Sequence, residues 1–119
     1  MYKVAADPAR NRLELLVGGR ISLAELIEVR DAVAAELQRL KPGYLAAIDL
    51  RSMQVLMPDQ TEVLAEVQAV LMRAEPARIG TLVASSTLEL QINRIGTRTT
   101  ISQVAHRFTD EAEWRAYVS

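Results

Sequence analysis

The chain has 119 residues, of which 50% are apolar and 24% are charged, which indicates a single globular domain over residues 1–119 rather than a disordered segment. Its 14 basic residues nearly balance its 15 acidic ones, so the overall charge does not favour binding to nucleic acid or to an anionic membrane. It contains no cysteine, which excludes disulfides and thiolate chemistry, and it has no apolar run of the roughly 18 residues that a membrane span needs. We therefore expect a cytoplasmic protein without a membrane span.

The first two expected strands form an antiparallel hairpin. Tyr2–Ala6 is predicted to be a short strand, and the alternation of apolar and other residues over Arg12–Val17 predicts a second, half-buried strand. The stretch Asp7–Asn11 joins them, because Asp and Pro favour turns and Asn11 can take a left-handed conformation. Gly18 and Gly19 then end the second strand.

Strands and helices alternate over the rest of the chain. Three pairs at capping-box spacing, Ser22 with Glu25, Asp59 with Glu62 and Ser86 with Glu89, predict three helix starts. The predicted elements are a helix from Ser22 to about Leu40, a strand over Tyr44–Leu50, a helix over Gln60–Ala74, a strand over Arg78–Ser85, a helix over Thr87–Thr99, a strand over Gln103–Phe108, and a helix over Glu111–Val118 capped by Thr109 or Asp110. The order β-β-α-β-α-β-α-β-α predicts an α/β fold with four helices and a five-stranded, mixed but mostly parallel sheet.

This element order resembles that of the STAS superfamily, the sulfate transporter and anti-sigma-factor antagonist domains with the SpoIIAA-like fold. Three stretches carry the local resemblance. Residues 2–22 resemble the opening hairpin, Tyr44–Met53 resembles the central strand with its Asp-Leu pair at Asp49 and Leu50, and Phe108–Trp114 resembles the closing strand-to-helix turn. The resemblance implies a non-catalytic regulatory module that binds other proteins.

Regulatory members of that superfamily carry a phosphorylatable Ser or Thr at the start of the second helix. The matching stretch here is Met57–Gln60, which has no hydroxyl group, whereas Ser52 lies in the preceding loop and Thr61 lies one residue further on. We therefore do not expect the serine switch. Asp59 is either an ordinary helix cap or a fixed negative charge in the place of the phosphate.

The loop Ser52–Pro58 and the helix that follows it are the predicted partner-binding surface. The loop is unusually apolar, and its side chains either plug the end of the core or form an exposed lip. Small residues on a second face of the helix either admit another backbone closely or simply favour helix formation. The candidate partner-binding residues, for a protein partner that includes a second copy of the chain, are Met53, Leu56, Met57, Asp59, Ala65, Ala69 and Met72.

The third helix offers a candidate anion site. Ser85 and Ser86 stand at its predicted start, and Arg94 and Arg98 lie one turn apart, a spacing at which two arginines can hold a carboxylate or phosphate. The alternative is a solvated polar face, and the stripe is too small to indicate nucleic acid binding. A second functional hypothesis is a small molecule or lipid between helices and sheet, which requires an apolar cavity of roughly several hundred Å³.

An enzyme is not expected. His106 is the only histidine, and the sequence has no cysteine to pair with it, no Gly-x-Ser-x-Gly elbow and no glycine-rich phosphate loop. A catalytic role for His106 would require an open cleft at that side chain. We accordingly predict neither a cofactor nor a metal ion.

Overall fold

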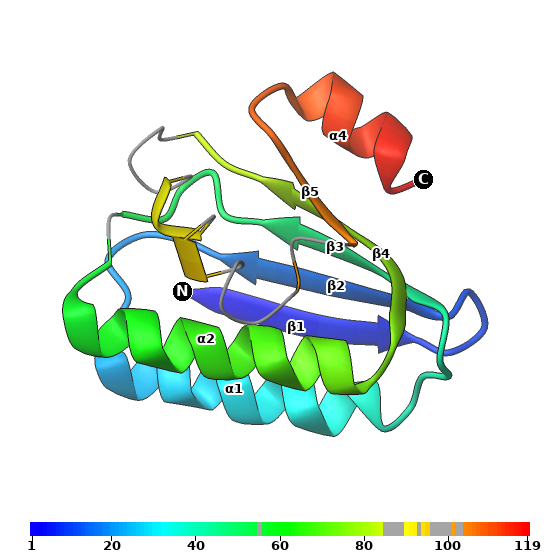
Figure 1. The fold of residues 1–119 in the computed structure, drawn as a ribbon, viewed down its shortest axis with the longest axis horizontal. Helices are drawn as coiled ribbons and strands as arrows, with labels where there is room; N and C mark the ends of the chain where they lie inside the picture. Colours follow the sequence, from blue (N-terminus) through cyan, green and yellow to red (C-terminus); the bar gives the residue numbers. More distant parts are fainter. Residues whose placement is uncertain (55, 85–89, 93, 96–100, 102–103) are drawn as a thin grey trace.

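Five strands form one mixed sheet in the order in which they occur along the chain, β1-β2-β3-β4-β5. The computed structural model describes residues 1–54, 56–84, 90–92, 94–95, 101 and 104–119. Its elements are β1 (Tyr2–Asp7), β2 (Arg12–Val17), α1 (Leu23–Leu37), β3 (Tyr44–Asp49), α2 (Pro58–Arg73), β4 (Pro76–Leu82), β5 (Ala105–Phe108) and α4 (Glu111–Tyr117), with helical residues 90–92 and 94–95 between β4 and β5. β1 pairs antiparallel with β2 and the other pairs are parallel, which confirms the predicted fold class (Figure 1).

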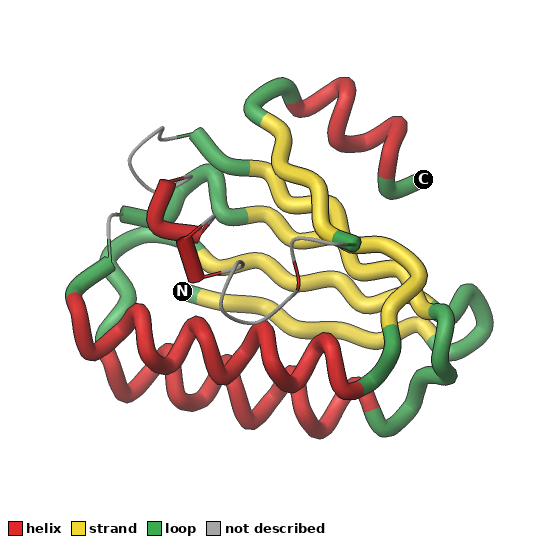
Figure 2. The backbone as a smooth tube through the Cα atoms, viewed as in Figure 1, coloured by secondary structure: helices red, strands yellow, loops and turns green. Residues whose placement is uncertain are grey.

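The crossover helices all lie on one face of this sheet. Each parallel strand is added beside the previous one, and a right-handed crossover repeated in one direction places its helix on the same side every time. α1 and α2 therefore lie next to each other under the sheet, while α4, which follows the last strand, lies on the opposite side (Figures 1 and 2).

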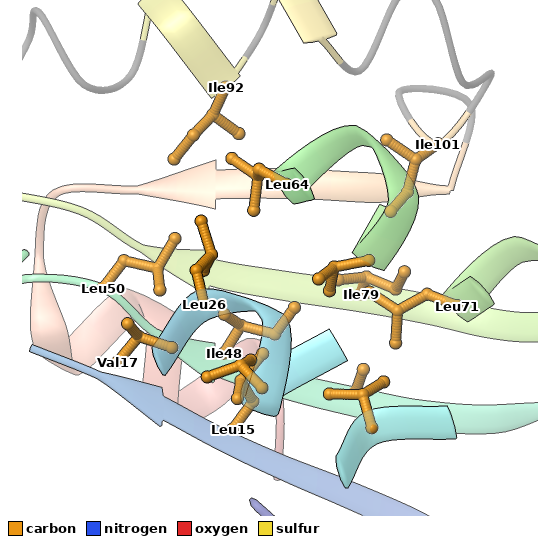
Figure 3. Packing of buried hydrophobic residues seen from close by; sticks show 14 of the residues in the cluster. Leu15, Val17, Leu26, Ile48, Leu50, Leu64, Leu71, Ile79, Ile92 and Ile101 are labelled. Carbon is orange, nitrogen blue, oxygen red and sulfur yellow. The ribbon is translucent and has the colours of Figure 1, made fainter. Parts of the chain in front are cut away.

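The main core fills the space between the sheet and the crossover helices. Alternate residues of each strand point into it, as do residues of α1 and α2 at helical spacing (Figure 3). β3 lies in the middle of the sheet and is buried along most of its length, as its nearly continuous apolar sequence predicted. Core side chains from these elements include Leu13, Leu15, Val17, Leu26, Val29, Val33, Ile48, Leu64, Val67, Leu71 and Ile79.

Local signals predicted the first turn and the start of α1 correctly. Asn11 has a φ of 52°, and the predicted capping box forms: the Glu25 N–H donates to Ser22 Oγ at 3.1 Å and the Ser22 N–H donates to Glu25 Oε1 at 3.4 Å. The pKa of Glu25 lies below its usual value, mainly because its carboxylate accepts the hydrogen bond from the Ser22 N–H. α1 ends at Leu37 rather than Leu40, because Gln38 to Leu40 bond to carbonyls three residues back and form tight turns.

The predicted start of α2 is wrong by two residues. Pro58 occupies the first helical position and Met57 is the N-cap residue, so Asp59 lies inside the first turn and does not cap the helix. Proline favours this position because its fixed φ suits a helix and its missing N–H would have no intrahelical partner there. Gln60, not Glu62, reaches back to the cap, where its Oε1 accepts the Met57 N–H at 2.8 Å.

The second half of the chain also departs from some predicted bounds. β4 begins at Pro76 and ends at Leu82, earlier than predicted at both ends, since proline is tolerated as the first residue of a strand. Asp110 caps α4, its carboxylate accepting the Ala112 N–H at 2.8 Å. The predicted Ser86–Glu89 capping box lies outside the described residues.

A second, smaller core holds α4 against the far face of the sheet. Trp114 Nε1 donates to the Gly80 carbonyl at 2.9 Å, and Trp114 and Val118 pack with Ala47 and Leu82. Gly80 makes this close approach possible, because a Cβ atom at residue 80 would lie 2.5 Å from Val118 Cγ1. The contact between α4 and the sheet therefore depends on a residue without a side chain.

We predict that Gly80→Ala displaces α4 and lowers the free energy of unfolding by about 1–3 kcal/mol, because the added methyl group overpacks the contact. Denaturant unfolding measures the change. Val118→Ala in the same chain should recover part of the loss by removing the opposing methyl groups. Equal losses from Gly80→Ala with and without Val118→Ala would contradict this account.

Tyr44 links the sheet to the end of α2. Its side chain is fully buried, and its hydroxyl donates to the Leu71 carbonyl at 2.6 Å. This carbonyl belongs to the last turn of α2, where carbonyl groups lack intrahelical partners. Burial also raises the pKa of the Tyr44 phenol above its ordinary value of 10.0.

Tyr44→Phe should lower the free energy of unfolding by about 1–2 kcal/mol at neutral pH, since it removes a buried hydrogen bond. Because the folded protein holds the phenol proton more tightly than the unfolded chain does, the contribution of Tyr44 is complete below pH 10.0 and falls as the pH rises above it. The wild type should consequently lose stability more steeply than Tyr44→Phe in urea titrations above that pH. Parallel slopes would rule out this role for the phenol.

Candidate functional site

Large apolar side chains are exposed at one end of the sheet. Among the described residues, the exposed large hydrophobic side chains are Met1 (61% exposed), Met57 (63%) and Leu90 (62%). The antiparallel strand β1 starts where the parallel strands β2 and β3 end, so Met1 lies at the same edge as the loop into α2 (Figures 1 and 2). We therefore take this carboxyl edge of the parallel strands as the candidate site.

Backbone hydrogen bonds connect the segments of this edge. The Gly18 N–H donates to the Met1 carbonyl at 2.9 Å, and the Gly19 N–H donates to the Ser52 carbonyl at 2.9 Å. Gly19 also forms an isolated parallel bridge with Met53. The start of β1, the end of β2 and the loop after β3 are thus held side by side.

The loop before α2 combines buried and exposed apolar residues. Met53 (5% exposed) and Leu56 (4%) belong to the main core, whereas Met57 points outward; Val55 lies outside the described residues. Of the two alternatives for this loop, a core plug or an exposed lip, Met53 and Leu56 form the core plug. Because they are buried, they cannot contact a partner. Met57 alone among these three occupies the position of the exposed lip.

Two glutamine side chains fix the position of Met57. Gln91 Oε1 accepts the Leu56 N–H at 3.0 Å and Gln91 Nε2 donates to the Leu56 carbonyl at 3.1 Å, so one amide group satisfies both backbone groups of Leu56. On the other side, Gln60 Nε2 donates to the Ile21 carbonyl at 2.8 Å. Neither residue was predicted as part of the site, although Gln60 stands three residues after the cap Met57, which is the spacing of a capping box.

A hollow of about 200 Å³ lies beside Met57, lined by Gly19, Arg20, Ile21, Gln54, Leu56 and Gln60. Arg20 and Gln54 are exposed at its rim. Leu90 precedes Gln91, whose amide bonds to Leu56 beside Met57, so Leu90 belongs to the same edge. We call this hollow, together with Met1, Met57 and Leu90, the carboxyl-edge surface. It combines an apolar lip, a shallow hollow and a polar rim, which is the usual composition of a protein contact.

The other predicted partner-binding residues lie along α2. Asp59 is exposed beside Met57, and its carboxylate accepts the Gln60 N–H at 2.9 Å. Ala65 is buried in the main core, Met72 is half-buried and packs against it, and Ala69 is half-buried. The structure therefore brings Asp59 and Met57 together, while Ala65 and Met72 take part in the protein's own packing.

The predicted anion site falls largely outside the described residues. Ser85, Ser86 and Arg98 are among the residues that the structure does not describe, and Arg94 is exposed on the helical segment. His106 is exposed on β5, where its ring meets the ring of Tyr117 at a centroid distance of 5.2 Å. In the part of the chain that the structure describes, no group of three or more His, Asp or Glu side chains could hold a metal ion. No helix there is long and apolar enough to cross a membrane.

The main core contains a cavity of about 40 Å³ between the sheet and the helices. Its lining is mostly apolar but includes Gln68, Thr81 and Arg107, and the first two are buried polar residues. Thr81 and Arg107 are paired neighbours on β4 and β5, so both side chains lie on the same face of the sheet. A cavity of about 40 Å³ has room for a few water molecules.

The sequence matches no protein-family model and no curated protein.

Gln91→Met should lower the free energy of unfolding by about 1–3 kcal/mol, because it leaves both backbone groups of Leu56 without their partner. It should also speed amide hydrogen exchange at Leu56. Gln38→Met, at an exposed residue after α1, is the matched control and should change stability by less than about 0.5 kcal/mol. Unchanged exchange at Leu56 would show that Gln91 does not fix the loop.

Proposed function

We propose that this protein is a non-catalytic, STAS-like interaction module that binds another protein through the carboxyl-edge surface. The observation that carries the proposal is Met57, an exposed side chain beside a hollow at the start of α2. Its own N–H donates to Gln60, and the amide of Gln91 holds the neighbouring Leu56. A soluble domain gains nothing in stability from an exposed methionine at a position fixed by hydrogen bonds, whereas a binding surface uses such a residue as an anchor.

The fold supports the assignment to a STAS-like module at the level of architecture. The sheet opens with an antiparallel pair and continues with parallel strands in chain order, an arrangement compatible with that superfamily. The start of α2, where the resemblance places the regulatory hydroxyl, carries Met57, Pro58 and Asp59. The proposed module therefore works by direct contact and without a serine switch.

The energetics of the surface favour a protein partner. Burying a methionine or leucine side chain that was exposed contributes about 1.5–3 kcal/mol, so Met57 and Leu90 together can supply a large part of a modest affinity. The exposed polar groups of Arg20 and Gln54 would lie at the rim of that contact, where they set orientation more than affinity. A second copy of the chain is one such partner.

The double substitution Met57→Ser and Leu90→Ser tests the proposal. Because both side chains are exposed, we expect unfolding stability to stay within about 0.5 kcal/mol of the wild type while association weakens at least about tenfold. Sedimentation equilibrium measures self-association, and affinity capture quantified against the wild type measures binding to a different protein. Arg39→Ser, at an exposed site after α1, is the control.

Equal association by the wild type and the double variant would refute a contact at the carboxyl-edge surface. The interaction module itself would be refuted if the wild type is strictly monomeric and captures no protein more strongly than the double variant does.

A second candidate function is the binding of a small molecule between helices and sheet. The mostly apolar cavity lined also by Gln68, Thr81 and Arg107 favours it, because a few polar groups in an apolar pocket are typical of ligand sites. At about 40 Å³ the cavity admits a ligand of only a few non-hydrogen atoms, and a lipid chain would require it to expand several-fold. The interaction module is therefore the better-supported proposal.

A further inference from the structure

The face of the sheet opposite α1 and α2 is only partly covered. α4 packs over Ala47, Gly80 and Leu82, on β3 and β4. Beside it a hollow of about 410 Å³ extends across β1 and β2. Ala5, Leu16, Ala47 and Val118 contribute apolar surface to this hollow, and charged side chains surround them.

The acidic groups in this hollow are already paired. Glu14 Oε1 lies 3.1 Å from Arg12 Nε, and Asp49 Oδ2 lies 3.2 Å from Arg51 Nε. Of the other lining cations, Arg115 pairs with Glu111 at 2.7 Å.

Lys3 and Arg10 line the same hollow, are exposed, and form no ion pair with any described residue. The Asp7 carboxylate, next to Arg10 in the turn, accepts the Arg10 backbone N–H at 3.3 Å. Two cationic side chains at the rim are thus available to a partner.

We propose that this open face binds an extended acidic segment of another protein, with Lys3 and Arg10 pairing with two of its carboxylates. The proposal concerns a different face from the carboxyl-edge surface and does not depend on binding there. Carboxylates suit both cations, and aliphatic side chains suit the small apolar floor around Ala5 and Leu16.

The spacing of the two cations favours an extended segment over a single small anion. Lys3 and Asp7 lie four residues apart on β1, a separation of roughly 14 Å along the strand, and Arg10 follows in the turn beyond Asp7. A single phosphate or carboxylate could contact both only if the two side chains bent toward each other, whereas each cation can pair with its own carboxylate on an extended chain. An extended chain presents residues i, i+2 and i+4 on one side over roughly this distance, so an acidic and an aliphatic side chain can lie over Lys3 and Ala5. Arg10 lines the same hollow from the turn and can reach an acidic side chain at i+4.

A negative charge between the two cations, the Glu14 carboxylate, disfavours the binding of nucleic acid. Glu14 is paired with Ala5 across the hairpin, between the levels of Lys3 and Arg10, and its side chain is 61% exposed. A nucleic acid strand would place phosphates near this carboxylate, whereas a protein segment can place a neutral residue there. The net charge of −1 also provides no long-range attraction for a polyanion.

The test uses a synthetic peptide with blocked ends and the sequence Ser-Glu-Ser-Val-Ser-Glu-Ser, titrated into the full chain and followed by backbone NMR. Amide signals of Lys3, Ala5 and Leu16 should shift. Lys3→Glu and Arg10→Glu should each weaken binding about tenfold, because a favourable pair becomes a repulsive one. Arg73→Glu, an equal charge change at an exposed residue on α2, should leave binding unchanged.

A charge-swapped peptide, with lysine in place of both glutamates, separates the proposal from a general loss of structure. It should not bind the wild type and should bind the chain that carries both Lys3→Glu and Arg10→Glu. The proposal fails if the acidic peptide leaves the Ala5 and Leu16 signals unmoved, or if both single variants bind it as the wild type does. Tighter binding of a thymidine oligonucleotide at the same amides would assign the face to nucleic acid instead.

Discussion

The order of the strands determines where this protein can have binding surfaces. Because β2, β3, β4 and β5 are added side by side in one direction, their crossovers cover a single face, and that face becomes the main core. Among the described strands the order never reverses, so this sheet lacks the switch point beside which open α/β sheets usually bind ligands. Two of the surfaces that the helices leave uncovered are the carboxyl edge of the parallel strands and the part of the far face beside α4.

The carboxyl-edge surface has a fixed shape because polar side chains satisfy the backbone of its loop. Leu56 is buried, and an unsatisfied backbone group at that position would cost about 1–3 kcal/mol, so the amide of Gln91 holds the loop in one conformation. Gln60 does the same for the Met57 N–H and the Ile21 carbonyl. Burial of Met53 and Leu56 anchors the loop from within, and its exposed apolar residue is presented without a large loss of conformational freedom on binding.

Several features set by neighbouring residues in the sequence could be predicted, while the burial of individual side chains, which depends on distant residues, could not. The strand Arg12–Val17, the left-handed Asn11 and the Ser22–Glu25 capping box follow from alternation, turn chemistry and spacing. The apolar loop before α2 did not show which residues would be buried, because Met53 and Met57 differ only in what the fold places over them. No sequence motif marked Lys3 and Arg10 either. They line one hollow because of the hairpin register and the position of α4.

Asp49, the last residue of β3, connects the open face to the loop that leads to the carboxyl-edge surface. Its side chain lines the hollow on the open face, and its Oδ1 accepts the Arg51 N–H at 3.1 Å at the start of the loop that leads to Met57. Arg51 in turn pairs with Asp49 and with Glu111 in the first turn of α4. The Asp-Leu pair at the end of the central strand thus has a structural role here: it joins the loop of one surface to the helix that borders the other.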